Sequence, residues 1–285
     1  VDALNMALQN GEIDMIAQLP AASASLFSDT DTYTIGAATS TRSQFLQFNL
    51  ESEALKDVNI RKAISMCIDR EGYADVVFAG YAKPSYGIYP DTLSYGGTDG
   101  INLSVDKYDT EAAKALVEAA GYTPEKPLEL KLVTDSYNTG LLQMTDMLQP
   151  ELEAIGIKLS IETYDVLDDV LQAGNFDIAA LSYALAPTGN AQYLINMLFV
   201  SDGTDNYGHY SNSDVDADAQ KLETTFDTSE RDAIVKDLTQ KVVDDCPDAF
   251  IASQQLLIVY NNKVTGVDVN PSEYYLITNT LDIAE

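Results

Sequence analysis

The sequence is poor in the residues that build metal and catalytic centres, with one histidine, His209, and two cysteines, Cys67 and Cys246, among 285 residues. The cysteines stand far apart and form no Cys-x-x-Cys pair, which excludes a zinc knuckle and a thioredoxin-type motif, and we expect two free thiols. No Gly-rich phosphate loop, Gly-x-Ser-x-Gly or His-Glu-x-x-His motif occurs. We therefore expect a protein that is not an enzyme.

Long apolar runs and basic residues are scarce as well. No stretch of about 18 apolar residues occurs, so no segment is predicted to cross a membrane. The 16 Lys and Arg residues are outnumbered by 45 Asp and Glu residues, which gives a formal net charge of −29. This charge repels a phosphate backbone and excludes nucleic acid as a partner. Hydrophobic residues make up 46% of the chain, enough for a folded core beneath a well-solvated surface.

The middle of the sequence alternates between strand and helix patterns. Three strand patterns are separated by two helix patterns, at 128–135, 139–155, 157–164, 165–173 and 175–184. Gly156 and Gly174 are expected to end the two helices, and Pro150 to kink or split the first. The order strand, helix, strand, helix, strand predicts a parallel sheet with right-handed crossovers.

Further elements are predicted on both sides of this block. They are a strand at 43–50, helices at 57–78, 110–122, 210–226 and 229–246, and strands within 249–269. The stretch 80–100 is rich in Gly, Pro and Tyr and is predicted to be a loop. The whole pattern is that of an α/β protein.

Two similar phrases, LQNGEIDMIA near the start and LQAGNFDIAA 163 residues later, occur in the chain. In each, a helix is predicted to end at a glycine with positive φ, Gly11 or Gly174, and an apolar strand follows two residues later. Asp14 and Asp177 hold the same place in the two phrases. The repeat either reflects the common α/β succession of helix, glycine and strand, or marks two similar lobes.

Several segments, in order along nearly the whole chain, resemble one known family. They are LQNGEIDMI, QFLQFNL, DVNIRKAISMCIDREGYADVVFAGYAKPSYGIYP, YDTEAAKALVEAAGY, LEAIGIKLSIE, AGNFDIAALSY, HYSNSDVDA and VTGVDVNPSEYYLIT. Together they resemble the extracellular solute-binding proteins of ABC importers in the oligopeptide, dipeptide and nickel class, family 5. The third segment carries the most recognisable motif, in which Asp57, Arg61, Asp69 and Arg70 match.

The resemblance implies a periplasmic-binding-protein-like fold (type II, cluster C), with two lobes that close over a cleft. We expect an α/β lobe with a mainly parallel sheet flanked by helices, plus strands of an incomplete first lobe. Residues 1–47 correspond to the last part of lobe one, 48–250 to lobe two, and 251–285 to the return across the hinge. The chain is thus expected to be a C-terminal fragment without the beginning of lobe one and without any signal or lipid anchor.

By the same resemblance, the protein captures a peptide or a nickel or other metal-chelate ligand and delivers it to the ABC permease subunits in the membrane. No cofactor is implied, and a monomer is expected. The expected location is extracytoplasmic, either in the periplasm or at the cell surface as a lipoprotein. The alternative is a ligand-sensing or cell-surface adhesion protein on the same fold, and the sequence does not separate the two.

The family contacts its ligand through the loop after the strand at 175–184, at the carboxyl end where open α/β sheets bind ligands. Tyr183 takes the place of an aromatic contact, and Ala186 that of an acid that pairs with a peptide amine. Without this acid, capture of a free amine is disfavoured, because a buried ammonium needs a partner. Thr188 and Asn190 in the Pro-Thr-Gly-Asn run, with the tail PSEYYLIT, resemble the nickel and metal-chelate members more closely.

Two further residues invite a binding role. Arg42 stands before the hinge strand and can hold an anionic group through its planar guanidinium, or it is a surface or structural arginine. His209 is a natural nickel ligand by type, yet we expect a surface loop histidine. No metal site is predicted. Asp214, Asp216 and Asp218 begin like a calcium loop but lack its later ligands, so we expect them to be acids at a helix start.

Overall fold

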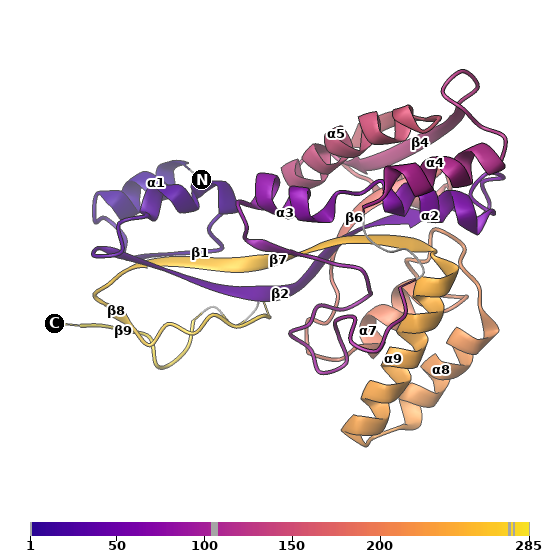
Figure 1. The fold of residues 1–285 in the computed structure, drawn as a ribbon. Helices are drawn as coiled ribbons and strands as arrows, with labels where there is room; N and C mark the ends of the chain where they lie inside the picture. Colours follow the sequence, from indigo (N-terminus) through magenta and orange to yellow (C-terminus); the bar gives the residue numbers. More distant parts are fainter. Residues whose placement is uncertain (1, 104–107, 273–274, 276, 285) are drawn as a thin grey trace.

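The computed structural model describes residues 2–103, 108–272, 275 and 277–284. Two long antiparallel strands, β2 (Tyr33–Phe48) and β7 (Asp248–Asn261), run through the length of the molecule (Figure 1). The strand predicted at 43–50 begins earlier, because residues 33–39 pair with the second half of β7. These two strands connect the two ends of the molecule.

The other strands extend this pair on both sides, in the order β1-β7-β2-β6-β4-β5. The added strands are β1 (Met15–Ala17), β3 (Ala82–Pro84), β4 (Leu128–Asp135), β5 (Ile157–Tyr164) and β6 (Ile178–Ala184). β4 is parallel to both β5 and β6, as predicted, whereas β6 is antiparallel to β2. β3 pairs with β7 and forms within the stretch predicted as a loop.

The predicted succession of strand and helix in the middle of the chain is confirmed. α5 (Thr139–Ala154) connects β4 to β5, and α6 (Asp168–Gln172) connects β5 to β6. Pro150 lies inside α5 and does not divide it. After α5 the chain turns at Gly156, whose φ is +95°, and a Cβ there would lie 2.7 Å from the backbone of Thr123. Only glycine fits both the angle and the space.

Helices cover the two faces of the sheet and bury separate hydrophobic cores. The α5 face is covered by α2 (Val58–Met66), α3 (Arg70–Phe78), α4 (Thr110–Ala119) and α5. The opposite face, here the α9 face, is covered by α6, α7 (Gln192–Leu194), a π-helix at 195–199, α8 (Ser213–Thr224) and α9 (Thr228–Asp245). In Figure 1 the two groups lie above and below the sheet at the same end of the molecule.

The single helix predicted at 57–78 is two helices, α2 and α3. Asp69 caps α3 by accepting a hydrogen bond from Gly72 N at 2.9 Å. The next residue, Arg70, is buried and donates to the carbonyl oxygens of Phe250 at 2.7 Å and Ser65 at 3.0 Å. Because Phe250 is 180 residues away, the helical periodicity of 57–78 does not reveal the break between the two helices.

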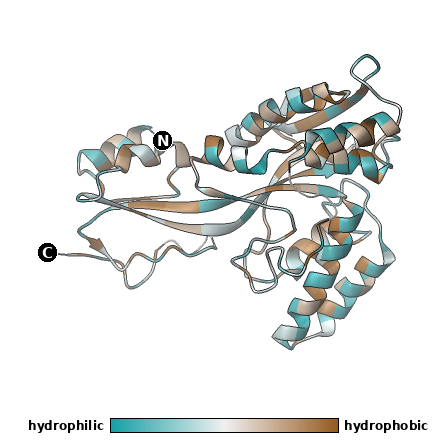
Figure 2. Ribbon diagram, viewed as in Figure 1, coloured by the Kyte–Doolittle hydropathy of each residue, from teal (hydrophilic) through white to brown (hydrophobic). Residues whose placement is uncertain are grey.

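The other end of the molecule has a smaller core. α1 (Asp2–Gln9) and a 3-10 helix at Ala21–Phe27 cover β1 and the second half of β7 there. The short pair β8 (Val264–Thr265) and β9 (Asp282–Ile283) lies on the other side of these strands (Figure 1). Figure 2 shows hydrophobic residues along β7, between these layers.

The two similar phrases take the same local form. Gly11 and Gly174 have φ values of +73° and +65°, as predicted, and each strand begins two residues later than expected. Asp14 and Asp177 directly precede the strands. Asp177 accepts hydrogen bonds from Lys131 N at 2.7 Å and from the Ser52 hydroxyl at 2.6 Å, so its carboxylate ties β6 to its neighbours.

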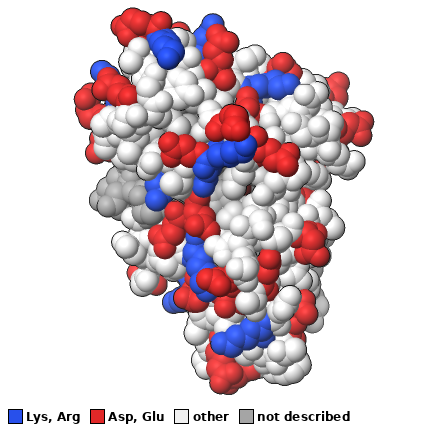
Figure 3. All heavy atoms as spheres, turned by 90° about the vertical axis from the view of Figure 1, so that its right-hand side faces the viewer, with Lys and Arg blue, Asp and Glu red and all other residues white. Residues whose placement is uncertain are grey.

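The surface carries the acidic excess. On the face in Figure 3, Asp and Glu side chains are spread over the whole surface, with Lys and Arg between them. Within the described ranges, no helix is both long and apolar enough to cross a membrane.

Candidate functional site

The topology separates the connections that follow β4 and β6. The two strands are parallel neighbours, but the chain leaves β4 into α5 on one face and leaves β6 toward α7 on the other. Where neighbouring strands send their connections to opposite faces, the loops separate and leave room for a ligand at the carboxyl edge. The loops at 136–138 and 185–191 are the segments that follow these two strands.

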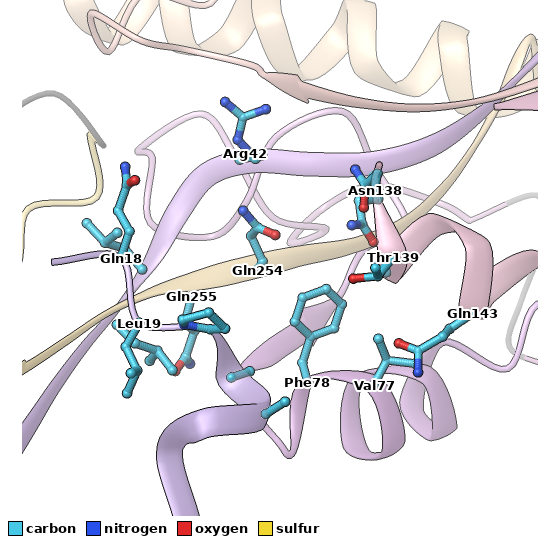
Figure 4. A pocket seen from close by; sticks show the side chains of 17 residues that line it. Gln18, Leu19, Arg42, Val77, Phe78, Asn138, Thr139, Gln143, Gln254 and Gln255 are labelled. Atoms are coloured by element: carbon cyan, nitrogen blue, oxygen red, sulfur yellow. The ribbon is translucent and has the colours of Figure 1, made fainter. Parts of the chain in front are cut away.

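On the α5 face a pocket of about 580 Å³ lies beside this edge and is lined by residues from both ends of the molecule. Figure 4 shows its lining side chains. We call it the amide pocket. Its polar side chains are mostly amides, from the segment after β1, from β2, from the start of α5 and from β7: Gln18, Gln44, Asn138, Gln143, Gln254 and Gln255. Val77 and Phe78 of α3 form its apolar wall. Amides both donate and accept hydrogen bonds, so the pocket suits a polar ligand that carries both kinds of group.

Arg42 is the only charged side chain that lines the amide pocket within the described ranges. It is half-buried, and its Nη1 lies 3.4 Å from the carbonyl oxygen of Ser182 on β6. In Figure 4 its guanidinium lies at the upper rim, apart from Phe78 and Thr139. A guanidinium at the rim of a pocket of neutral amides provides the positive charge for an anionic group of a ligand.

Tyr73 fixes the inner wall of the amide pocket. Its hydroxyl is hydrogen-bonded to Gln44 Oε1 and lies 2.9 Å from the carbonyl oxygen of Gly140. Burial raises the pKa of Tyr73 above its usual value, so the hydroxyl stays protonated. The contact orients the Gln44 amide and joins β2 to the start of α5.

The structure does not bring Tyr183 and Arg42 together. Tyr183 pairs with Ser43, and Arg42 pairs with Ala184 across β2 and β6. Paired residues share a face and successive residues alternate, so the two side chains leave the sheet on opposite faces. Arg42 belongs to the α5 face and Tyr183 to the α9 face.

Tyr183 has its own polar partner. Its ring lies 5.7 Å from that of Phe45, and its hydroxyl donates to Asp205 Oδ2 at 3.1 Å. Burial and, after it, the nearby Asp205 carboxylate raise the pKa of Tyr183. Asp205 was not predicted as a partner of Tyr183, because nothing in the segment around Asp205 indicates a contact with a residue 22 positions earlier.

Thr188 and Asn190 are exposed on the loop after β6. Asn190 Oδ1 accepts hydrogen bonds from Gln192 N and from Arg231 Nη2, both at 3.1 Å, and so anchors the loop to α9. Neither residue lines the amide pocket. Ala186, where the resemblance implies an acid in peptide-binding members, is 1% exposed.

The residues considered as metal ligands are not gathered into a site. Within the described ranges, no group of three or more His, Cys, Asp or Glu side chains is placed to hold a metal ion. His209 is exposed, 3.8 Å from Glu51. Both cysteines are free, as predicted. Both are also buried, and burial raises the pKa of each thiol to about 12. Asp214 and Asp216 lie in the first turn of α8, as expected.

Comparison with known proteins identifies relatives over the whole chain. The family model described as bacterial extracellular solute-binding proteins, family 5 Middle, matches residues 1–206. The nickel-binding protein NikA of Staphylococcus aureus is 28% identical over 271 residues, which are 95% of this chain and 54% of that protein. The glutathione-binding protein GsiB of Pectobacterium atrosepticum is 25% identical over 280 residues, 94% of this chain and 53% of that protein.

Solved structures confirm the predicted fold. The crystal structure of NikA from Staphylococcus aureus in complex with Ni(L-His)2 matches with a TM-score of 0.82 and 28% identity, over 99% of this chain and 60% of that one. The crystal structure of a nickel ABC transporter protein from Bacillus halodurans matches with a TM-score of 0.86 and 25% identity. The chain spans about half the length of the curated relatives it matches.

Proposed function

Because the chain belongs to the bacterial extracellular solute-binding proteins of family 5, we propose that it captures a small polar solute outside the cytoplasm for an ABC importer. It delivers this solute to the permease subunits in the membrane and catalyses no reaction. The amide pocket carries the proposal, since its lining comes from both ends of the molecule and includes Asn138, which follows the carboxyl end of β4. The relatives are binding proteins by name, which does not favour the alternative of a sensing or adhesion protein.

We further propose that the lobes divide as the sequence analysis has them, with 1–47 and 251–285 in lobe one and 48–250 in lobe two. β2 and β7 are the strands that cross these boundaries. The amide pocket then receives Gln18 from lobe one and Asn138 and Gln143 from lobe two. Closure of the lobes around β2 and β7 shields a ligand from water.

For the ligand we propose a metal chelate with carboxylate groups, with a short peptide as the second candidate. A free metal ion lacks donors, since no group of three His, Cys, Asp or Glu side chains gathers in the described ranges. The first relative named above is a nickel-binding protein, and its structure holds Ni(L-His)2. An organic chelator offers carboxylates to Arg42 and polar atoms to the amides. Ala186 removes the acid that a peptide amine requires.

Arg42 is the residue of the proposed contact set that lines the amide pocket. Tyr183, at the end of β6, and Thr188 and Asn190, in the loop that follows it, remain proposed contacts outside the amide pocket. The set therefore divides into one contact within the pocket and three outside it.

Calorimetric titration tests the assignment, with nickel plus L-histidine, nickel chloride alone and a panel of di- and tripeptides. Saturable binding of nickel–histidine without binding of nickel alone is the expected result. Arg42→Ala should weaken it about tenfold, the effect of one charge-assisted contact of about 1.4 kcal/mol. Lys158→Ala is the matched control, because Lys158 is exposed on β5, away from the pocket. If neither chelate nor peptide binds, the proposed function fails.

A further inference from the structure

A second pocket, of about 460 Å³, lies on the α9 face of the long strands. We call it the lysine pocket. Its walls come from β2, β3, β7, α9 and the loop at 85–99, through Thr39, Lys83, Ser253, Lys236 and residues of that loop. It shares no lining residue with the amide pocket. Ser253 pairs with Ser43, the residue that also pairs with Tyr183, which puts Ser253 on the opposite face from Arg42.

Ser253 is the unusual residue of the lysine pocket. It is 2% exposed, and its Oγ has no hydrogen-bond partner among the described residues. Buried hydroxyls are nearly always hydrogen-bonded, since an unpaired one costs about 1–3 kcal/mol. Its neighbour across the strands, Ser43, is equally buried but donates to the carbonyl oxygen of Ala252 at 3.2 Å. The Ser253 hydroxyl therefore has an unused hydrogen bond at the wall of the pocket, whereas the Ser43 hydroxyl does not.

Two ammonium groups accompany this hydroxyl. Lys83 pairs directly with Ser253 across β3 and β7, so the two side chains stand side by side on one face. Lys83 Nζ is held 3.0 Å from Asp91 Oδ2. Lys236 approaches from α9 and is half-buried, and no carboxylate of a described residue lies within ion-pair distance of it. Because it forms no ion pair with a described residue, its ammonium group is available to an anion in the pocket.

We propose that the lysine pocket is a second ligand site, which binds a small oxyanion through Lys236 and Lys83 with a hydrogen bond from Ser253. The oxyanion is a phosphate or carboxylate group, either free or as part of a larger molecule. Lys236 supplies an ammonium group without an ion pair among the described residues, whereas the ammonium group of Lys83 also forms an ion pair with Asp91. Asp99, which is exposed, also lines the pocket and repels an anion, so the proposed binding position lies near the buried Ser253.

Titration with inorganic phosphate, with sodium chloride at equal ionic strength as the reference, tests the proposal. Saturable binding is expected, and Lys236→Met should weaken it about tenfold. Ser253→Ala should weaken it about threefold, while Ser43→Ala leaves it unchanged. Lys221→Met is the control for net charge, because Lys221 is exposed on α8 outside the pocket. Citrate then tests whether a carboxylate competes with phosphate for the same site.

Three results would overturn the proposal: no saturable binding of either anion, equal weakening by Lys221→Met and Lys236→Met, or unchanged affinity in both Lys236→Met and Ser253→Ala. Unchanged affinity in both variants would mean that the Ser253 hydroxyl does not contact the anion. Competition by citrate supports a general oxyanion site, and phosphate binding without competition supports a tetrahedral one. Arg42→Ala separates this site from the proposed function, because it affects chelate binding in the amide pocket and leaves phosphate binding as it was.

Discussion

The two faces of the sheet treat their buried polar groups differently. On the α5 face these groups find partners: Tyr73 bonds to Gln44, and Arg70 donates to several carbonyl oxygens. On the α9 face three buried atoms have none within the described residues, and they belong to Gln47, Asp248 and Ser253. Since an unpaired buried polar group is costly, the α9 face holds polarity that packing alone does not explain.

The unpaired oxygens of Gln47 and Asp248 belong to neighbouring residues. They pair directly across β2 and β7, and each leaves one oxygen, Oε1 or Oδ2, without a donor. Burial raises the pKa of Asp248 well above its usual value. A protonated Asp248 carries a hydrogen that the unpaired Gln47 Oε1 is able to accept. Of the two faces, therefore, only the α9 face leaves buried side-chain groups unpaired among the described residues, at Gln47, Asp248 and Ser253.

The largest effect is expected from breaking the satisfied network. Arg70→Met removes the donor for the carbonyl oxygens of Ser65, Ser85 and Phe250. Leaving several buried acceptors unpaired should lower the free energy of unfolding by at least about 3 kcal/mol. Urea denaturation measures this loss, and Lys62→Met on the adjacent helix α2 serves as the control. A loss below about 1 kcal/mol would contradict the difference between the faces.

A change of opposite sign is expected at Asp248. Its folded pKa is raised above the unfolded value of about 3.9, so the folded state binds the proton more tightly. The stability that it contributes is complete below that unfolded pKa and is lost as the pH rises through the folded pKa. Asp248→Asn keeps a donor for Gln47 at every pH. The variant should gain about 1–3 kcal/mol over the native protein at high pH.

Urea denaturation at a series of pH values from 4 to about 9 isolates this effect, because other carboxylates titrate equally in both proteins. The difference in free energy of unfolding should grow with pH and then level off. Asp237→Asn, an exposed carboxylate on α9, provides the comparison and should show a small difference. A difference for Asp248→Asn that does not change with pH would exclude the shared proton.

The sequence predicts the strands of the sheet, but it does not predict which residues share a face. The alternation of apolar and polar residues in 128–135 and 157–164 predicted β4 and β5 correctly, because the pattern of a strand lies within the strand's own segment. The break between α2 and α3 was missed, since Arg70 finds Phe250 at a distance of 180 residues. Tyr183 and Arg42 were predicted in one contact set, and only the register of β2 against β6 assigns them to opposite faces.

The amide pocket was missed for a related reason. Its glutamines come from four separate segments, and none of these carries a motif. Gln44 and Gln254 were visible only as polar residues within predicted strands. A polar residue in the middle of an apolar strand is the one local signal that indicates a pocket at that position. Gln47 and Ser253 are also polar residues within predicted strands, but they are buried groups of the α9 face that have an unpaired atom.

The smallest expected effect tests the separation of the faces directly. Tyr183→Phe removes the hydrogen bond to Asp205 and should cost about 1 kcal/mol of unfolding free energy. Combined with Arg42→Ala, the two losses should add within about 0.5 kcal/mol, because the two side chains leave the sheet on opposite faces. A double-mutant cycle by urea denaturation measures the coupling. A coupling above about 1 kcal/mol would mean that Arg42 and Tyr183 communicate through the sheet, and the amide pocket and the loop at 185–191 would then form one site.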